Sequence, residues 1–168
     1  MNGTVDYPRV VVRRATAADL ATIVELRLAM MIEITELRRV SGAPTDPLDL
    51  AALRPPNERW IAEHLDRDFL AWLAEIDDRP VGSVGLLWFS HPPGPTSAPG
   101  TEAYLLNVYT RPEARRMGLA RALMERAIEA AREAGVKRVW LRTSEAGRPL
   151  YESLGFRPRD NDLRLDIE

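Results

Sequence analysis

The stretch that decides the fold runs from residue 104 to residue 142 and reads YLLNVYTRPEARRMGLARALMERAIEAAREAGVKRVWLR. Its apolar start, Tyr104 to Tyr109, indicates a β-strand that ends at a turn signal, Thr110-Arg111-Pro112-Glu113. After two arginines and a glycine, apolar residues recur with the spacing of one helix face, at positions 120, 123, 124, 127, 128, 131 and 134. Gly135 is typical of a helix C-cap, and Val136 to Leu141 predicts the next strand. The stretch therefore predicts one βαβ unit.

Composition places the chain among soluble globular proteins. Its 168 residues predict a single domain over residues 1–168, and 45% of them are hydrophobic and 29% charged. The net charge of −2 at pH 7 gives no electrostatic reason to expect nucleic acid or an anionic membrane surface as a partner. No apolar run approaches the length of a membrane span, and the N-terminal residues lack the apolar core of a signal peptide. We therefore expect a cytoplasmic protein.

Several residue types are scarce, and their scarcity excludes classes of chemistry. With no cysteine, disulfides, thiolate metal sites and a cysteine nucleophile are excluded. Lys137 is the single lysine, so no phosphate loop of the GxxxxGK[ST] type is present. His64 and His91 lie in no metal-binding pattern, and we predict no metal. The chain also lacks the GxSxG pattern of serine hydrolases.

Patterns in the first 66 residues predict one strand and two helices. The strand covers Val10 to Arg14, and Thr16 with Asp19 has the pattern of an N-cap followed by an acidic first turn. Apolar residues at 20, 23, 24, 28 and 31 then indicate a helix that reaches about Arg39. Prolines and small residues predict a loop or a broken helix over Ser41–Pro56, before a second helix over Asn57–Asp66.

The middle of the chain predicts a β-hairpin. Its apolar runs, Phe69 to Ile76 and Pro80 to Phe89, are joined by the turn Asp77-Asp78-Arg79. Gly82 and Gly85 within the second run indicate a bulge or a close approach of backbones. The proline-rich segment Ser90 to Gly100 breaks both secondary-structure periods, so we expect a mobile surface loop there. It is either a substrate lid or a plain connection.

The C-terminal part predicts a short helix and a last strand. The helix runs from about Arg148 to Leu154 with Gly155 beyond its end, and the strand lies near Leu163 to Ile167. Together with the preceding elements this gives an α/β fold, in which a mixed and mostly antiparallel sheet contains one parallel βαβ unit and carries helices on its faces.

The segment RRMGLA has the properties of an anion-binding loop. A helix that begins near Met117 offers unpaired backbone N–H groups and a partial positive charge. Gly118 lets the backbone approach a ligand closely, and nearby arginines match the geometry of phosphate oxygens: Arg115, Arg116 and Arg121. The alternative is an ordinary helix start with a solvated arginine cluster.

Two segments resemble the GNAT superfamily of N-acetyltransferases. NVYTRPEARRMGLA contains Arg115-x-x-Gly118-x-Ala120, which is similar to the family's acetyl-CoA signature [RQ]-x-x-G-x-[GA]. Downstream, SEAGRPLYESLGF is similar to the family's Leu-Tyr-Glu-x-Leu-Gly-Phe segment. The matching part extends from Tyr104 to Phe156, with the strand and the helix between the two motifs in the expected order.

The resemblance implies an acetyl-CoA site. It assigns the pyrophosphate to backbone N–H groups from Arg116 through Arg121, that is, of Arg116, Met117, Gly118, Leu119, Ala120 and Arg121. It pairs the pantetheine arm with the strand at Asn107, Val108 and Tyr109, and it places the acetyl group near Leu106 to Val108. Arg116 departs from the family, where glycine is common, and Ser144 stands where many members have asparagine.

The resemblance also places a tyrosine, Tyr151, within reach of the sulfur. A phenol with a pKa of about 10 can protonate a thiolate leaving group, whose pKa is about 8.5, so Tyr151 is the candidate general acid. The alternative is a tyrosine that packs in the core. Glu102 is the candidate general base, or else a solvated loop residue, and Tyr104 could hold a water. Glu33 and Glu36 lie where the family binds acceptors, or on the wet face of their helix.

We predict an N-acetyltransferase that moves the acetyl group of acetyl-CoA to a primary amine of a small molecule or peptide. Without cysteine, direct attack in a ternary complex is favoured over a covalent acyl-enzyme. The principal alternative is a non-catalytic acyl-CoA-binding regulatory module. A dinucleotide-binding protein fits poorly because the GxGxxG glycines are incomplete. Neither a nucleic acid nor a membrane is expected as a partner, whereas a homodimer is.

Overall fold

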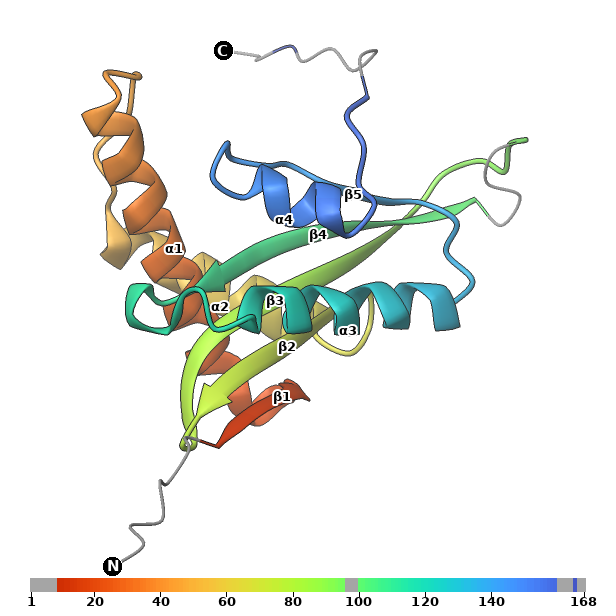
Figure 1. Cartoon of the computed structure of the whole chain (residues 1–168), viewed down its shortest axis with the longest axis horizontal. Helices are drawn as coiled ribbons and strands as arrows, with labels where there is room; N and C mark the ends of the chain where they lie inside the picture. The colour runs from red at the N-terminus through yellow and green to blue at the C-terminus, as the bar shows by residue number, and fades with distance from the viewer. Residues whose placement is uncertain (1–8, 96–99, 160–164, 166–168) are drawn as a thin grey trace, which may run out of the picture.

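The fold is a five-stranded sheet with helices on both faces (Figure 1). The computed structural model describes residues 9–95, 100–159 and 165. Strands β1 to β4 form antiparallel neighbours, and β5 joins β4 in parallel, so the strand order equals the chain order. The elements are β1 (Val10–Arg14), α1 (Leu20–Val40), α2 (Leu50–His64), β2 (Phe69–Ile76), β3 (Arg79–Ser90), β4 (Thr101–Thr110), α3 (Leu119–Glu133), β5 (Val139–Leu141) and α4 (Arg148–Ser153). The predicted α/β class and mixed sheet are confirmed.

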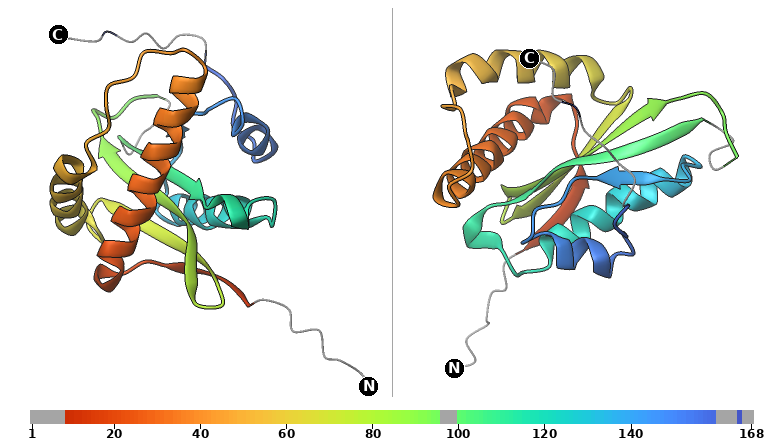
Figure 2. Two further views of the ribbon diagram at one scale, coloured as in Figure 1. Left: turned by 90° about the vertical axis from the view of Figure 1, so that its left-hand side faces the viewer. Right: turned by 90° about the horizontal axis from the view of Figure 1, so that it is seen from above.

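Two hydrophobic cores lie on the two sides of this sheet. Helix α3 covers one face, and α1 with α2 covers the other (Figures 1 and 2). Because neighbouring residues of a strand point to opposite faces, each central strand supplies both cores. The α3 core includes Trp72, Leu86, Leu105, Leu123 and Met124, and the α1/α2 core includes Ile23, Leu26, Ile61, Phe69 and Leu73. Each buried side chain of this size stabilises the fold by about 1.5–3 kcal/mol.

The start of α1 follows the predicted cap. Thr16 precedes a short 3-10 turn, and its N–H and hydroxyl donate to the Asp19 carboxylate at 2.8 and 3.1 Å. That carboxylate satisfies donors that would otherwise have no partner at the start of a helix.

Helix α2 begins earlier than predicted. Asp49 caps it by accepting a hydrogen bond from the Ala52 N–H at 3.0 Å, so the segment predicted as a loop or a broken helix is helical from Leu50 and a loop only before it. Pro55 and Pro56 lie inside the helix and remove two of its N–H donors. The carbonyls they leave unpaired are on Ala51 and Ala52, which are exposed, so water can satisfy them.

The β2–β3 hairpin confirms the predicted turn, and Gly82 confirms the predicted close approach of backbones, since a Cβ there would come within 2.9 Å of the Tyr109 carbonyl oxygen. Asp77 and Asp78 have φ values of 50° and 62°, as a two-residue turn with both central residues left-handed requires. Gly85 lies against the ring of Phe69, where a Cβ would come within 2.5 Å of the ring. A larger residue at position 85 would therefore displace a fully buried phenylalanine.

Strand β4 carries a bulge in its second half. Ser83 pairs with Tyr109 and Gly85 with Leu106, so two residues of β4, Asn107 and Val108, lie opposite one residue of β3. Asn107 has a left-handed φ of 55°, a conformation that asparagine tolerates better than most residues.

Strand β5 is shorter than predicted. The Val136 N–H donates to the Ala131 carbonyl at 3.0 Å and so closes α3, which delays the strand to Val139. β5 then pairs with β4 only along Ala103–Leu105, whereas β4 continues to Thr110. Within the described ranges, the edge of β4 beyond Leu105 has no neighbouring strand on the β5 side, which leaves backbone groups there available to a ligand.

Two of the predicted segments are described only in part by the structure. The predicted last strand near Leu163 to Ile167 lies outside the described residues, except for residue 165, which is in no strand. The loop Ser90 to Gly100 is described except for residues 96–99, and its base is closed by a 2.8 Å hydrogen bond from the His91 N–H to the Gly100 carbonyl. Among the described residues, no helix is long and apolar enough to span a bilayer.

Candidate active site

A cavity of about 700 Å³ lies between α1, the second half of β4, the loop before α3, and α4. It brings together all the predicted ligand-binding residues except Met117, as well as the predicted acid: Leu106, Asn107, Val108, Tyr109, Arg115, Arg116, Gly118, Leu119, Ala120, Arg121, Ser144 and Tyr151. Met117 and Glu102 are not on its wall.

The loop before α3 presents backbone donors to this cavity. Gly118 is the N-cap of α3 with a left-handed φ of 79°, and the first helical hydrogen bond runs from the Ala122 N–H to the Gly118 carbonyl at 3.0 Å. The N–H groups of residues 119–121 precede that bond and have no acceptor inside the helix. Arg116 also has a left-handed φ, 61°, so this position keeps the glycine-like backbone with a side chain attached. The arrangement suits a phosphate.

The three arginines of the loop have different surroundings. The Arg115 guanidinium donates to both carboxylate oxygens of Glu33 at 2.5 Å, and its Nε donates to the Thr110 carbonyl at 3.1 Å. Arg121 donates to the Ser153 hydroxyl at 2.6 Å. Arg116 is exposed and has no ion pair with a described residue. Arg115 therefore fixes α1 to the loop, whereas Arg116 is open to a ligand.

Tyr151 lies on α4 with its ring half-buried. Its ring packs edge-on against Phe156 and so closely against Gly147 that a Cβ there would come within 2.9 Å. Its hydroxyl makes no hydrogen bond with any described residue, and burial raises the pKa of this phenol above its ordinary value. Tyr151 thus stays protonated at neutral pH beside the cavity, as a proton donor requires. Ser144, also on the wall, accepts the Gly147 N–H at 3.2 Å and so shapes the turn into α4.

Glu102 lies elsewhere. It is buried, with 5% of its surface exposed, so the alternative of a solvated loop residue is wrong. Its carboxylate accepts hydrogen bonds from Arg138 at 2.7 Å and from the indole N–H of Trp140, and His91 lies 3.4 Å away. These contacts occupy both carboxylate oxygens at the start of β4, away from the cavity wall. Glu102 thus lies outside the cavity wall with both oxygens engaged, and its role as general base stays a prediction.

Helix α1 contributes Arg27 to the cavity wall, a residue that belongs to neither sequence motif. Its Nε donates to the Asn57 side-chain oxygen at 2.5 Å, and its Nη1 donates to the side-chain oxygen of Asn107 at the β4 bulge. Burial lowers the pKa of the guanidinium from its ordinary value. A signal for it exists in the sequence, because position 27 follows Ile23 by four residues and Val24 by three and so lies on the buried face.

The rest of the α1 wall is mostly apolar. Met30, Ile34 and Leu37 line the cavity together with Glu33, whereas Glu36 is exposed and pairs with Arg39 at 2.7 Å. Of the two glutamates in the predicted acceptor region, Glu33 therefore lines the cavity, and Glu36 lies on the solvent-exposed face of α1. Burial, and next to it the Glu33 carboxylate, raises the pKa of Tyr109 on the opposite wall. Tyr104, the candidate to hold a water, also lines the cavity.

No group of histidine and carboxylate side chains that could hold a metal ion occurs among residues 9–95, 100–159 and 165. The polar groups on the cavity wall are backbone donors, arginines, tyrosines, the hydroxyls of Thr110 and Ser144, the Asn107 amide and one carboxylate, that of Glu33.

Two curated proteins similar to this chain are N-acetyltransferases. The chain is 38% identical over 64 residues to a glucosamine 6-phosphate N-acetyltransferase of Trypanosoma brucei brucei, which is 38% of this chain and 44% of that enzyme. It is 43% identical over 58 residues to the [Ribosomal protein bS18]-alanine N-acetyltransferase of Escherichia coli K12, 33% of this chain and 39% of that enzyme. Both matches thus span less than half of the relative.

Solved structures extend the likeness over nearly the whole chain. A GCN5-related N-acetyltransferase from Ralstonia eutropha JMP134 superposes with a TM-score of 0.80 at 29% identity, over 95% of this chain and 99% of that one. A predicted acetyltransferase from Clostridium acetobutylicum, solved with acetyl-CoA, shares the fold with a TM-score of 0.81 at 24% identity, over 94% and 96% of the two chains.

The family model described as Acetyltransferase (GNAT) family matches residues 31–156, which include most of the cavity wall, the loop before α3 and Tyr151, but not Arg27 or Met30. This chain belongs to the GNAT acetyltransferase family.

Proposed function

We propose that the protein transfers the acetyl group of acetyl-CoA to a primary amine on a small molecule or peptide, by direct attack within a ternary complex. The observation that carries this proposal is the single cavity wall on which a phosphate-type backbone loop, an unpaired strand edge and a protonated tyrosine meet. GNAT-fold acetyltransferases use acetyl-CoA, and the relatives named above acetylate an amino sugar phosphate and an alanine of a ribosomal protein.

The residues fit the parts of acetyl-CoA in order along the wall. The pyrophosphate would lie on the backbone N–H groups from Arg116 through Arg121, where Gly118 has nothing within 4 Å of the space a Cβ would fill. The pantetheine amides would pair with the free edge of β4 at Asn107–Tyr109, and the acetyl group would lie near Leu106–Val108. This order makes the Tyr151 end of the cavity the acyl end.

The chemistry then needs two proton transfers. The amine nitrogen attacks the acetyl carbonyl carbon, and the carbon–sulfur bond breaks as the new carbon–nitrogen bond is completed. Tyr151 donates its hydroxyl proton to the leaving sulfur, so that CoA departs as a thiol. The proton of the attacking amine passes to water in the cavity beside Tyr104, because Glu102 is held by Arg138 and Trp140. Since the chain has no cysteine, no acyl-cysteine intermediate forms.

The test is thiol release from acetyl-CoA with a panel of primary amines. Because the chain contains no cysteine, every thiol that is detected comes from CoA. Acetyl-CoA at a hundredfold excess over its Kd should stabilise the fold by about 2.7 kcal/mol, which a thermal shift detects. A thermal shift without thiol release on any amine would favour the non-catalytic acyl-CoA-binding module. Absence of both would contradict the cavity assignment itself.

A further inference from the structure

Arg27 has capacity to bind a ligand that the fold does not use. A guanidinium has five N–H donors, and the two hydrogen bonds that Arg27 makes within the protein both end on amide oxygens, of Asn57 and Asn107. Its Nη2 makes no hydrogen bond with any described residue. The two N–H groups on Nη2 and the remaining one on Nη1 form a fork of the kind that binds a carboxylate or phosphate.

No carboxylate neutralises this guanidinium. The one carboxylate on the cavity wall, Glu33, is engaged by Arg115, and no described acidic residue lies within ion-pair distance of Arg27. A half-buried cation without a counter-ion is costly, since desolvation is not repaid by a charge of opposite sign. A protein that keeps such a cation in a cavity gains most when an anion enters.

The position of Arg27 separates this anion from the phosphates of CoA. Arg27 precedes Glu33 by six residues on α1, about 9 Å along a helix, and Glu33 contacts Arg115 of the loop before α3. Arg27 instead contacts Asn107 at the bulge, in the part of β4 assigned to the acyl end. The unpaired cation therefore lies beside the reacting groups.

We propose that Arg27 is the anion-binding residue of the acceptor subsite and that the acceptor is a primary amine that carries a carboxylate or a phosphate. The inference rests on the acetyl transfer proposed above. Met30, Ile34 and Leu37 supply apolar surface for the remainder of the acceptor.

The experiment compares matched acceptors in the thiol-release assay. L-leucine is set against 3-methylbutylamine, which lacks only the carboxylate, and against L-leucinamide, in which it is neutral. Glucosamine 6-phosphate against glucosamine, and O-phosphoethanolamine against ethanolamine, form the phosphate arm. We expect kcat/KM to favour the anionic member of at least one arm by about tenfold or more, as charged hydrogen bonds allow. The arm with the larger preference identifies the anion as carboxylate or phosphate.

The variant Arg27→Gln should reduce that preference to near unity, mainly through KM, and Arg27→Lys should restore part of it. Comparing the preference between wild type and variant cancels differences in amine basicity. Arg39→Gln is the matched control, because Arg39 is an exposed arginine of the same helix and lies outside the cavity wall. It should leave the preference unchanged. A thermal shift with acetyl-CoA checks that each variant folds.

The outcomes separate the two proposals. Equal kcat/KM for anionic and neutral acceptors in the wild type overturns the inference but leaves acetyl transfer standing, and this result does not depend on any variant folding. A uniform loss of kcat on all acceptors in Arg27→Gln also overturns it, since Arg27 would then act on the acetyl group. If acetyl-CoA binds and no amine of either kind releases thiol, the proposed function fails, and the inference fails with it.

Discussion

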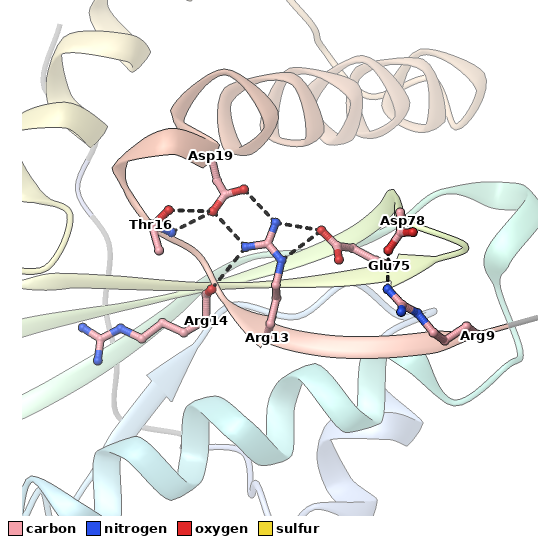
Figure 3. Close-up of polar contacts among 7 residues, drawn as sticks. All are labelled: Arg9, Arg13, Arg14, Thr16, Asp19, Glu75 and Asp78. Carbon is pink, nitrogen blue, oxygen red and sulfur yellow. Dashed lines mark hydrogen bonds and ion pairs between the residues drawn. The ribbon is translucent and has the colours of Figure 1, made fainter.

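Two arginines, Arg13 and Arg27, differ in what surrounds them, and the difference distinguishes a residue that stabilises the fold from one that lines the candidate site. The Arg13 guanidinium lies between two carboxylates (Figure 3). It donates to both oxygens of Asp19 at 2.7 and 2.9 Å and to Glu75 at 2.7 and 3.0 Å. Arg27 has only amide oxygens as partners. Arg13 therefore joins β1, β2 and the start of α1, whereas Arg27 keeps donors for a ligand.

The pKa shifts of the two guanidinium groups have opposite signs. The hydrogen bonds that the Arg13 guanidinium donates to Asp19 and Glu75 raise the pKa of Arg13, and burial lowers the pKa of Arg27. A cluster whose charges are matched stabilises the fold, so its loss should change stability and leave activity intact. Arg27 and Tyr151 on the cavity wall have donors without a partner in the described protein, so their loss should change activity and leave stability largely intact.

The largest effect is expected on the cavity side, from Tyr151→Phe. Loss of a general acid lowers a rate by about 10²- to 10⁴-fold, so kcat with the best amine should fall within that range. The thermal shift with acetyl-CoA should stay, because the phenyl ring still packs against Phe156 and Gly147. Steady-state kinetics at saturating acetyl-CoA measures the change. An unaltered kcat would remove Tyr151 from the mechanism.

On the side of the matched charges, Asp19→Asn should destabilise the protein by about 1–3 kcal/mol, as loss of a charged hydrogen bond does. The Arg13 guanidinium holds the pKa of the Asp19 carboxyl well below its usual range. Its contribution is therefore present above the unfolded pKa of about 3.9 and is lost as the pH falls through that value toward the folded one. Urea unfolding at pH 7 and below pH 4 should show that the difference in the free energy of unfolding between wild type and variant becomes smaller in acid.

The exposed pair Arg9–Asp78 offers the control, since its side chains are 68% and 77% accessible. Asp78→Asn should change the free energy of unfolding by less than about 0.5 kcal/mol, as is common for surface ion pairs. If Asp19→Asn altered kcat rather than stability, the contrast between the two arginines would be lost.

A smaller effect is expected from Gly118→Ala. A left-handed backbone costs a residue with a Cβ about 1–2 kcal/mol, so stability should fall by that amount. The Kd for acetyl-CoA should also rise, because the methyl group enters the space above the backbone donors. Gly135→Ala makes an ideal comparison: it has φ 73°, nothing within 4 Å of the added Cβ, and lies at the other end of α3, away from the cavity. Gly135→Ala should lower the free energy of unfolding by the same amount as Gly118→Ala, while calorimetry should find the Kd for acetyl-CoA unchanged.

The smallest effect is expected from Arg116→Gly. Glycine removes the strain of a left-handed φ at position 116, but it adds about 0.5–1 kcal/mol of backbone entropy to the unfolded chain. The two contributions nearly cancel, so unfolding in urea should shift by less than about 1 kcal/mol. A destabilisation of several kcal/mol would mean that the Arg116 side chain holds the loop.

Local patterns predicted most of the fold, because helix caps, hairpin turns and apolar periods act within a few residues of the chain. They did not predict the start of α2, because proline usually interrupts a helix. Pro55 and Pro56 are tolerated here because the carbonyls that lose their N–H partners are exposed. The burial of Glu102 could not be predicted because its partners, Arg138 and Trp140, are far along the sequence. The contacts of Arg27 could not be predicted for the same reason, because Asn57 and Asn107 lie near it only in the folded chain.

The free edge of β4 has an evolutionary consequence. Main-chain N–H and C=O groups are the same for every residue except proline, which lacks the N–H. A cosubstrate that pairs with residues 106–109 through the backbone therefore constrains their side chains little, apart from excluding proline at donating positions. Apart from Asn107, whose side chain accepts a hydrogen bond from Arg27, the side chains there could diverge and reshape the pocket for new amines while the proposed backbone contacts to acetyl-CoA persist. A short β5 thus allows one scaffold to change its acceptor by ordinary point mutation.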